Sequence, residues 1–310
     1  MANLEQLISQ KAERDKSWRE QRQMERENAY DMQDAGIVEV TSNPEMYGRY
    51  LAMQGDNPMY SPGNVVLVMF TKPEFTQFGT RDRWKTLRRY VPDSMVGKGT
   101  QIFAAPGSRN PFVEAYDITQ TEGRPIERLQ LADDSPEMES ALNTLLNHAV
   151  VPITVNHDLE SPAFYDEVQM ELLVNPSYPD SEAFPAIAAE VVHCRFHAKG
   201  YNAGYTREDY DLHAQSISYL LCRRYVVERE LPNVSVVSEH YESLDPQERK
   251  KILDGLQDMS KQIGGAIEYN IKPQQKAPVI PTPRRNHSSC LLYTSPSPRD
   301  LSTSRMPSSA

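Results

Sequence analysis

The stretch AFPAIAAEVVHCRFHAKGYN, residues 183–202, decides how the second half of the chain is interpreted. It nearly contains the pattern HExxH, in which two histidines on one helix bind zinc and the glutamate polarises a metal-bound water. Here Ala189 stands where the first histidine belongs, whereas Glu190 and His193 keep the glutamate and second-histidine positions. The stretch therefore lacks one ligand of the pattern, and Glu190 is a degenerate catalytic position.

A second frame, four residues further on, keeps both histidines but not the glutamate. His193 and His197 are spaced to share one face of a helix, and Asp211 or His213 on the next predicted helix could complete a ligand set. Cys194 takes the place of the glutamate, so such a site would have no general base. We expect no catalytic residue and no cofactor, with a residual Zn²⁺ site as one alternative and an ordinary helix with two histidines as the other.

Composition excludes several classes of protein. The formal net charge is −10 over 310 residues, which argues against general polyanion binding but not against a local basic groove. No apolar run approaches the ~20 residues of a membrane span, so we expect no membrane partner. Before residue 290 the cysteines are Cys194 and Cys222, too few for a disulfide framework, which favours a reducing cytoplasm.

Helix and strand signals alternate along the chain. Asn43 before Pro44, and Ser61 before Pro62, are N-cap and first-turn pairs that predict helix starts. The run VVLVMF that follows Ser61 is expected to be buried. Strands are predicted at TQIFAAPG, PFVEAYDITQT, VVPITVN and EVQMELLVNP, and further helices over 3–33, from Thr80, over 181–199 and in the last third. The pattern is typical of an α+β protein with two small domains.

The densest basic cluster lies in RDRWKTLRRY, which begins at Arg81. Cations beside aromatic rings suit single-stranded DNA, because cations follow the phosphates while rings stack on any base. The alternative is a solvated helix face with Trp84 in the core. The residues predicted to bind DNA are Trp84, Lys85, Arg88, Arg89 and Lys98, with Tyr60 and Phe103 as further stacking candidates.

Five motifs in order, NPEMYGRYLAMQ, YSPGNVVLVMF, RDRWKTLRRYV, GKGTQIFAAPG and AYDITQT, resemble the N-terminal domain of ArdC-type antirestriction proteins of conjugative elements. The resemblance covers about residues 30 to 121, and implies a single-stranded DNA-binding domain joined to a zincin-like domain. The step LRRYVPDSMVGKG departs from the compact Gly-containing step usual in that family.

The second half resembles the zincin-like helices of ArdC-type and LtrC-like proteins, in AAEVVHCRFH and YDLHAQSISYLLCRRYVVE. The resemblance implies a third metal ligand from the stretch here written DLHAQS, where Asp211 and Gln215 replace glutamates. Because two separated ligand positions depart from the pattern, we interpret this half as a catalytically inactive, mainly helical zincin-like domain with a small sheet.

The predicted organisation has six parts. They are an exposed charged helix (1–33), an ArdC-like single-stranded DNA-binding domain (34–121), a linker (122–133), a degenerate zincin-like domain (134–271), a disordered tail (272–289), and a stretch resembling a translated sequencing adaptor that is not native (290–310). We expect the natural sequence to break off near Ser289.

These observations favour a single-stranded DNA-binding protein of a mobile element that protects transferred DNA, with restriction or conjugation proteins as candidate protein partners. Two alternatives remain open. One is a zinc metallopeptidase with a non-standard ligand set. The other is a protein-binding antirestriction adaptor that does not bind DNA.

Overall fold

The computed structural model describes residues 3–108, 110–198 and 204–272. The predicted tail beyond Lys272 and the 290–310 stretch lie outside the described residues. The α-helices are α1 (Leu4–Ser42), α2 (Pro44–Asp56), α3 (Pro62–Thr71), α4 (Arg81–Thr86), α5 (Pro136–His148), α6 (Asp180–Phe196), α7 (Arg207–Tyr225), α8 (Val237–Tyr241) and α9 (Pro246–Ile271), with 3₁₀ turns η1 (Asp93–Met95) and η2 (Ile118–Gln120). The strands are β1 (Phe78–Thr80), β2 (Arg89–Tyr90), β3 (Thr100–Phe103), β4 (Phe112–Asp117), β5 (Glu122–Gly123), β6 (Ile153–Val155), β7 (Ala163–Asp166) and β8 (Glu171–Val174).

Helix α1 continues nine residues past the end predicted at residue 33. Its first part is largely exposed, whereas Ile37 and Val40 are fully buried against α3 and α9. Gly36 allows the close approach to α3, since a Cβ there would lie 2.6 Å from Val66 Cγ1. The extra turns form because these apolar positions bury their side chains, which stabilises a helix more than propensity does.

The predicted helix starts are confirmed. Asn43 accepts hydrogen bonds from the backbone N–H groups of Glu45 and Met46, and Ser61 accepts one from Asn64. In each case a proline occupies the first turn, where its missing N–H costs nothing. The predicted burial of VVLVMF holds for Val65–Met69, while Phe70 is 39% exposed.

In the described residues, three small sheets accompany the helices. An antiparallel sheet has the order β1-β4-β3, and β2 pairs with β5. The third sheet has the order β6-β8-β7, with β6 parallel and β7 antiparallel to β8. β7 was not predicted, since its sequence AFYD is too short to show clear alternation. The α+β class is confirmed.

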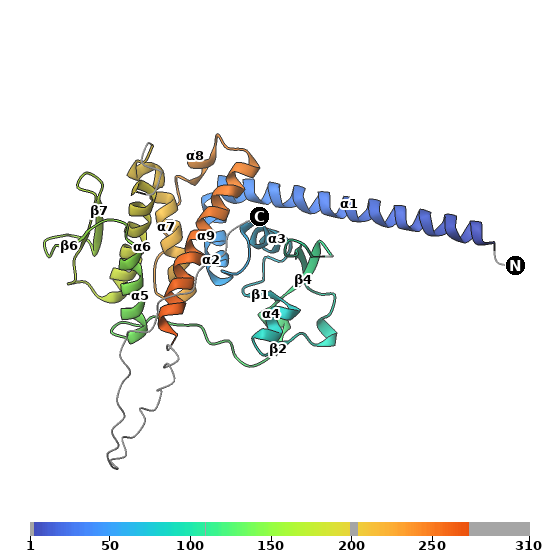
Figure 1. Ribbon diagram of the computed structural model, residues 1–310, viewed down its shortest axis with the longest axis horizontal. Helices are drawn as coiled ribbons and strands as arrows, with labels where there is room; N and C mark the ends of the chain where they lie inside the picture. Colours follow the sequence, from blue (N-terminus) through green and yellow to red (C-terminus); the bar gives the residue numbers. More distant parts are fainter. Residues whose placement is uncertain (1–2, 109, 199–203, 273–310) are drawn as a thin grey trace, which may run out of the picture. The chain divides into compact units, whose positions relative to one another are not determined.

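The later helices pack side by side and carry the third sheet. α6 lies against α7, α5 and α7 lie against α9, and β7 lies along α6 (Figure 1). α2 also packs on α7, so the hydrophobic core is continuous from Ile37 to Ile267. The proposed boundary between an N-terminal and a zincin-like domain stays a prediction. None of the described helices has the length and apolar character needed to cross a membrane.

Candidate nucleic-acid interface

Helix α4 carries the basic cluster and is fixed by one buried ring. Thr80 caps it by accepting a hydrogen bond from Arg83 N at 3.2 Å. Trp84 is 2% exposed, and its Nε1 donates to Tyr116 O at 3.0 Å. A ring enclosed by the core offers no face to a base, so the expectation that Trp84 stacks on DNA is corrected. Trp84 instead holds α4 on the sheet.

The charged side chains around Trp84 point the other way, into solvent. Lys85 lies 3.5 Å from Asp82, and both side chains are more than two thirds exposed. Such an exposed ion pair contributes little to folding stability. The other exposed cations of this region form no ion pair with a residue in the described part of the chain; they are Arg81, Arg83, Arg88 and Lys98. We define the α4 face by five residues: Arg81, Arg83, Lys85, Arg88 and Lys98. It contains three of the predicted DNA-binding residues.

Arg89 has a structural role instead. Its guanidinium donates to Thr121 Oγ1 at 2.8 Å, to Thr121 O at 2.7 Å and to Arg124 O at 2.6 Å. These bonds fix the β2–β5 pair, so the donors are not free for a phosphate. The prediction of Arg89 as a phosphate contact is therefore corrected.

The two weaker stacking candidates are also engaged. The Tyr60 ring lies 4.5 Å from that of Phe78, and its hydroxyl accepts from Thr80 N at 3.1 Å. The Phe103 ring stacks on Tyr30 of α1 at 4.6 Å. Tyr90 is the exposed ring of the cluster, at 54%, with its hydroxyl donating to Glu122. Of the interleaved aromatic residues, Tyr90 is thus the one positioned to stack.

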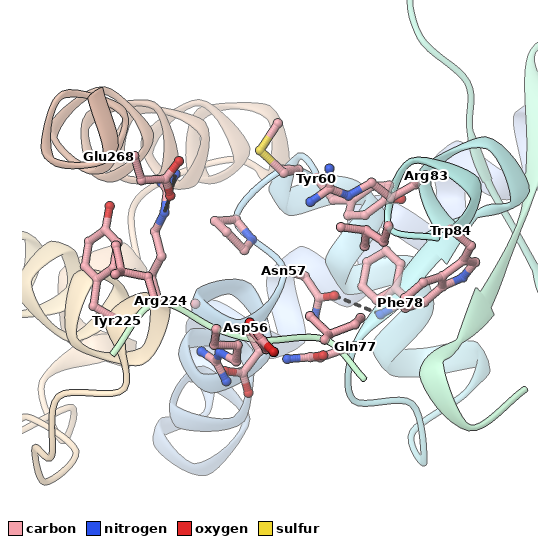
Figure 2. A pocket seen from close by; sticks show the side chains of 18 residues that line it. Asp56, Asn57, Tyr60, Gln77, Phe78, Arg83, Trp84, Arg224, Tyr225 and Glu268 are labelled. Carbon is pink, nitrogen blue, oxygen red and sulfur yellow. Dashed lines mark hydrogen bonds and ion pairs between the residues drawn. The ribbon is translucent and has the colours of Figure 1, made fainter. Parts of the chain in front are cut away.

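A pocket of about 430 Å³ adjoins α4 (Figure 2). Its walls come from the end of α2, the segment before β1, α4, the segment 126–129, α7 and α9. Asp56 forms ion pairs with Arg128, at 3.1 Å, and with Arg223. Arg224 forms an ion pair with Glu268 at 2.7 Å. Opposite charges are therefore matched at the base of the pocket, while Arg83 on its rim is exposed.

In the HExxH-like stretch, Glu190 is held by Arg207. Arg207 Nη2 lies 2.7 Å and Nη1 3.1 Å from the two carboxylate oxygens, and Tyr165 N donates to Oε2 at 2.7 Å. Glu190 is 7% exposed and Ala189 3%. A carboxylate with both oxygens engaged by a guanidinium is poorly placed to act as a base. Arg207 is the residue that sequence reasoning missed, because it lies 17 positions away on another helix.

The four candidate metal ligands do not converge. His193 Nδ1 lies 3.1 Å from the Tyr205 hydroxyl and its Nε2 3.4 Å from Asp211 Oδ1, whereas His197 Nδ1 lies 2.7 Å from the Tyr165 hydroxyl. The hydrogen bond with His193 lowers the pKa of Asp211. Within 3–108, 110–198 and 204–272, no three His, Cys, Asp or Glu side chains form a group that could hold a metal ion. A residual Zn²⁺ site therefore stays an untested alternative.

Cys194 and Cys222 are both buried. Burial raises the pKa of the Cys194 thiol to about 12 and that of Cys222 to about 11. Neutral, enclosed thiols are small apolar residues rather than nucleophiles or ligands.

His213 faces His240, a partner that sequence spacing did not suggest. Their Nε2 atoms lie 2.9 Å apart, and the rings are nearly perpendicular. Burial, assisted by His240, lowers the pKa of His213 to about 3, and burial also lowers that of His240, opposed by Asp209. The pair is therefore neutral at pH 7, with one ring donating to the other.

This pair predicts acid sensitivity. In the unfolded chain a histidine titrates near pH ~6.5, so the unfolded state takes up protons that the folded state excludes. The stability is fully present above pH ~6.5 and is lost as pH falls toward 3, by about 2 kcal/mol for His213 between pH 7 and 5. We expect the melting temperature of His213→Gln to depend less on pH than that of the wild type. The exposed His157→Gln is the control. Equal pH slopes in all three proteins would contradict the assignment.

Comparison with known proteins finds similarity among solved structures. No protein-family model matches the chain, and a search of curated proteins finds no match. Among solved structures, the chain is similar to the metal-free antirestriction ArdC protein from plasmid R388, with 15% identity and a TM-score of 0.41 over 68% of this chain and 85% of that one. The Mn(II)-bound structure of that protein gives 16% identity and the same TM-score, over 69% and 86%. Both of these solved structures are of an ArdC antirestriction protein, the family that the motifs of this chain resemble.

Proposed function

We propose that the chain binds single-stranded DNA through the α4 face and protects transferred DNA of a mobile element in an antirestriction role. One observation carries the DNA-binding part. Five basic side chains are exposed around one short helix, four of them without an acidic partner in the described chain, although the net charge of the protein is −10. Such a local concentration of cations favours a polyanion at this face.

The chemistry of the face favours a single strand. Its cations can follow phosphates without reading sequence, and Tyr90 beside them offers an exposed ring to an unpaired base. α4 has only six residues, about 9 Å of helix, so it is a short platform rather than a recognition helix for a major groove.

For the helical half we propose a supporting role without peptidase activity. The support is the Glu190–Arg207 ion pair, which engages both oxygens of the carboxylate in the general-base position. The continuous core that joins α7 to α2 also includes Phe78 of β1, the strand on which α4 packs, so these helices stabilise the support of the α4 face.

The test is a fluorescence anisotropy titration with a labelled oligothymidine of about 20 nucleotides. We expect Arg81→Ala with Arg88→Ala to weaken binding about 10-fold at about 50 mM salt, and to reduce the slope of log affinity against log salt by about 1.4. The physical reason is that the variant makes two fewer phosphate contacts, so its binding releases fewer counterions from the DNA.

The matched control removes two exposed cations elsewhere. Lys251→Ala with Lys261→Ala, on α9, changes net charge by the same amount and should leave affinity within about twofold. Equal losses in both double variants would show that the effect is net charge alone. Absence of binding by the wild type would overturn the proposal and favour a protein-binding adaptor.

A further inference from the structure

The pocket beside α4 contains buried charged groups whose hydrogen bonds are incomplete. Arg224 lines the pocket, and its buried Nη1 has no hydrogen-bond partner in the described chain. Nε of the neighbouring Arg223 is also buried without one, whereas Asp56 Oδ1 is paired with Arg128. The Arg224 side chain is only 9% exposed. Unsatisfied buried donors are rare and costly, so a polar ligand that accepts from Arg224 would be favoured at this end of the cavity.

The walls of the same cavity are aromatic. Tyr60 and Phe78 line one side and Tyr225 lines another, with the enclosed Trp84 ring beside Phe78 (Figure 2). Its volume of about 430 Å³ lies within the range of ~300–1,000 Å³ typical of small-molecule sites. Flat apolar walls with donors and acceptors at the edge suit a planar heterocycle that carries hydrogen-bonding groups on its rim.

Two side chains are available to form hydrogen bonds with the edge of such a heterocycle. The Gln77 side chain forms no hydrogen bond with another residue in the described ranges, and its amide can both donate and accept. Arg83 adds donors at the mouth. By contrast, Asn57 is already used, because its amide bonds to Met53 O, Thr76 O and Phe78 N. Amide and guanidinium groups are the usual partners of base edges.

We propose that this pocket binds one nucleobase. The inference rests on the proposed function, because Arg83 belongs both to the α4 face and to the pocket lining. A strand whose phosphates contact Arg81 and Arg88 brings a base to the pocket mouth, where unpaired bases can turn out of the strand. The same chemistry also fits a free nucleotide, and the two sources are separable.

The experiment compares oligothymidine with an abasic deoxyribose-phosphate strand of equal length. We expect the wild type to prefer the base-bearing strand about 10-fold. Gln77→Leu, which keeps the volume but removes the amide, should reduce that ratio below about 3-fold without changing the salt slope. Gln101→Ala, an exposed glutamine on β3 outside the pocket lining, should leave the ratio unchanged.

A charge-matched pair sharpens the test. Arg81→Ala and Arg83→Ala each remove one cation from α4, and both should weaken binding of both strands. Only Arg83→Ala should also lower the base preference, because Arg81 does not line the pocket. Far-ultraviolet circular dichroism and melting curves of each variant ensure that folding is unchanged.

The outcomes separate the two proposals. If neither strand binds, the proposed function fails. The pocket inference fails, while the DNA-binding proposal stands, if two results coincide. Both strands bind equally, or Gln77→Leu and Arg83→Ala leave the ratio unchanged, and deoxynucleoside monophosphates give no signals that depend on Gln77. Saturation-transfer NMR with deoxynucleoside monophosphates identifies the source. A free nucleotide would be the occupant if two results are found together. The base protons of the monophosphate give signals that vanish in Gln77→Leu, and the protein binds the base-bearing and abasic strands equally.

Discussion

Replacing Trp84 by alanine is expected to lower the free energy of unfolding by about 4 kcal/mol. The ring is 2% exposed, and a cavity of indole size cannot be filled by its neighbours. The change also leaves Tyr116 O without the donor that bonds it at 3.0 Å. Because a domain is stable by only about 5–15 kcal/mol, much of the protein would unfold at modest urea concentrations. Urea denaturation followed by circular dichroism measures the loss.

Trp84→Phe is the informative control. It keeps an aromatic ring in the core but loses the indole N–H, so we expect an intermediate loss of about 2 kcal/mol. DNA affinity of the folded fraction should stay close to that of the wild type in this variant. A Trp84→Ala protein that is as stable as the wild type but no longer binds DNA would restore Trp84 as a stacking residue and contradict its buried position.

Replacing Arg207 by alanine is expected to cost about 3 kcal/mol of stability. The variant removes both contacts to Glu190 and a donor to Tyr165 O at 2.9 Å. It leaves a carboxylate that is 9% exposed in its side chain without a countercharge. Breaking a buried pair costs more than the pair contributes net, because the remaining charge stays desolvated. The change in melting temperature measures the effect.

Two controls test this explanation. Arg22→Ala breaks the exposed Arg22–Glu25 pair on α1, 3.5 Å long, and should cost less than about 1 kcal/mol. Glu190→Gln combined with Arg207→Met removes both charges and should recover at least half of the loss. If the double variant is no more stable than Arg207→Ala, the cost comes from packing rather than from the unpaired charge.

Local signals in the sequence predicted local structure well. The Asn43 and Ser61 caps were correct because capping depends on a side chain and a backbone amide two or three residues away. The basic cluster was correctly placed on a helix beginning at Thr80 for the same reason. Whether a residue of that cluster faces the core or solvent depended on the sheet beneath it, and so Trp84 was assigned to the wrong side.

The candidate site was less predictable because its contacts join distant residues. Arg89 looked like a phosphate ligand, but its donors are taken by a turn more than 30 residues later. His240 had no partner by spacing, yet it lies against His213, 27 positions earlier. The pocket beside α4 combines six separate parts of the chain, from Gly55 to Glu268. Neither hydrophobic periodicity nor a local motif predicts which distant segments will lie together around a pocket.

The Glu190–Arg207 pair also limits how this sequence can change. A single substitution of Ala189 by histidine would complete the letters HExxH, but the glutamate would remain bound to the guanidinium at 2.7 Å. Removing Arg207 first would expose the protein to the full cost of an unpaired buried charge. A route to a metal-binding helix therefore needs at least two changes, of which one is deleterious alone and the other gains nothing alone. In evolutionary terms the ion pair is a barrier, because the two substitutions would have to arise together.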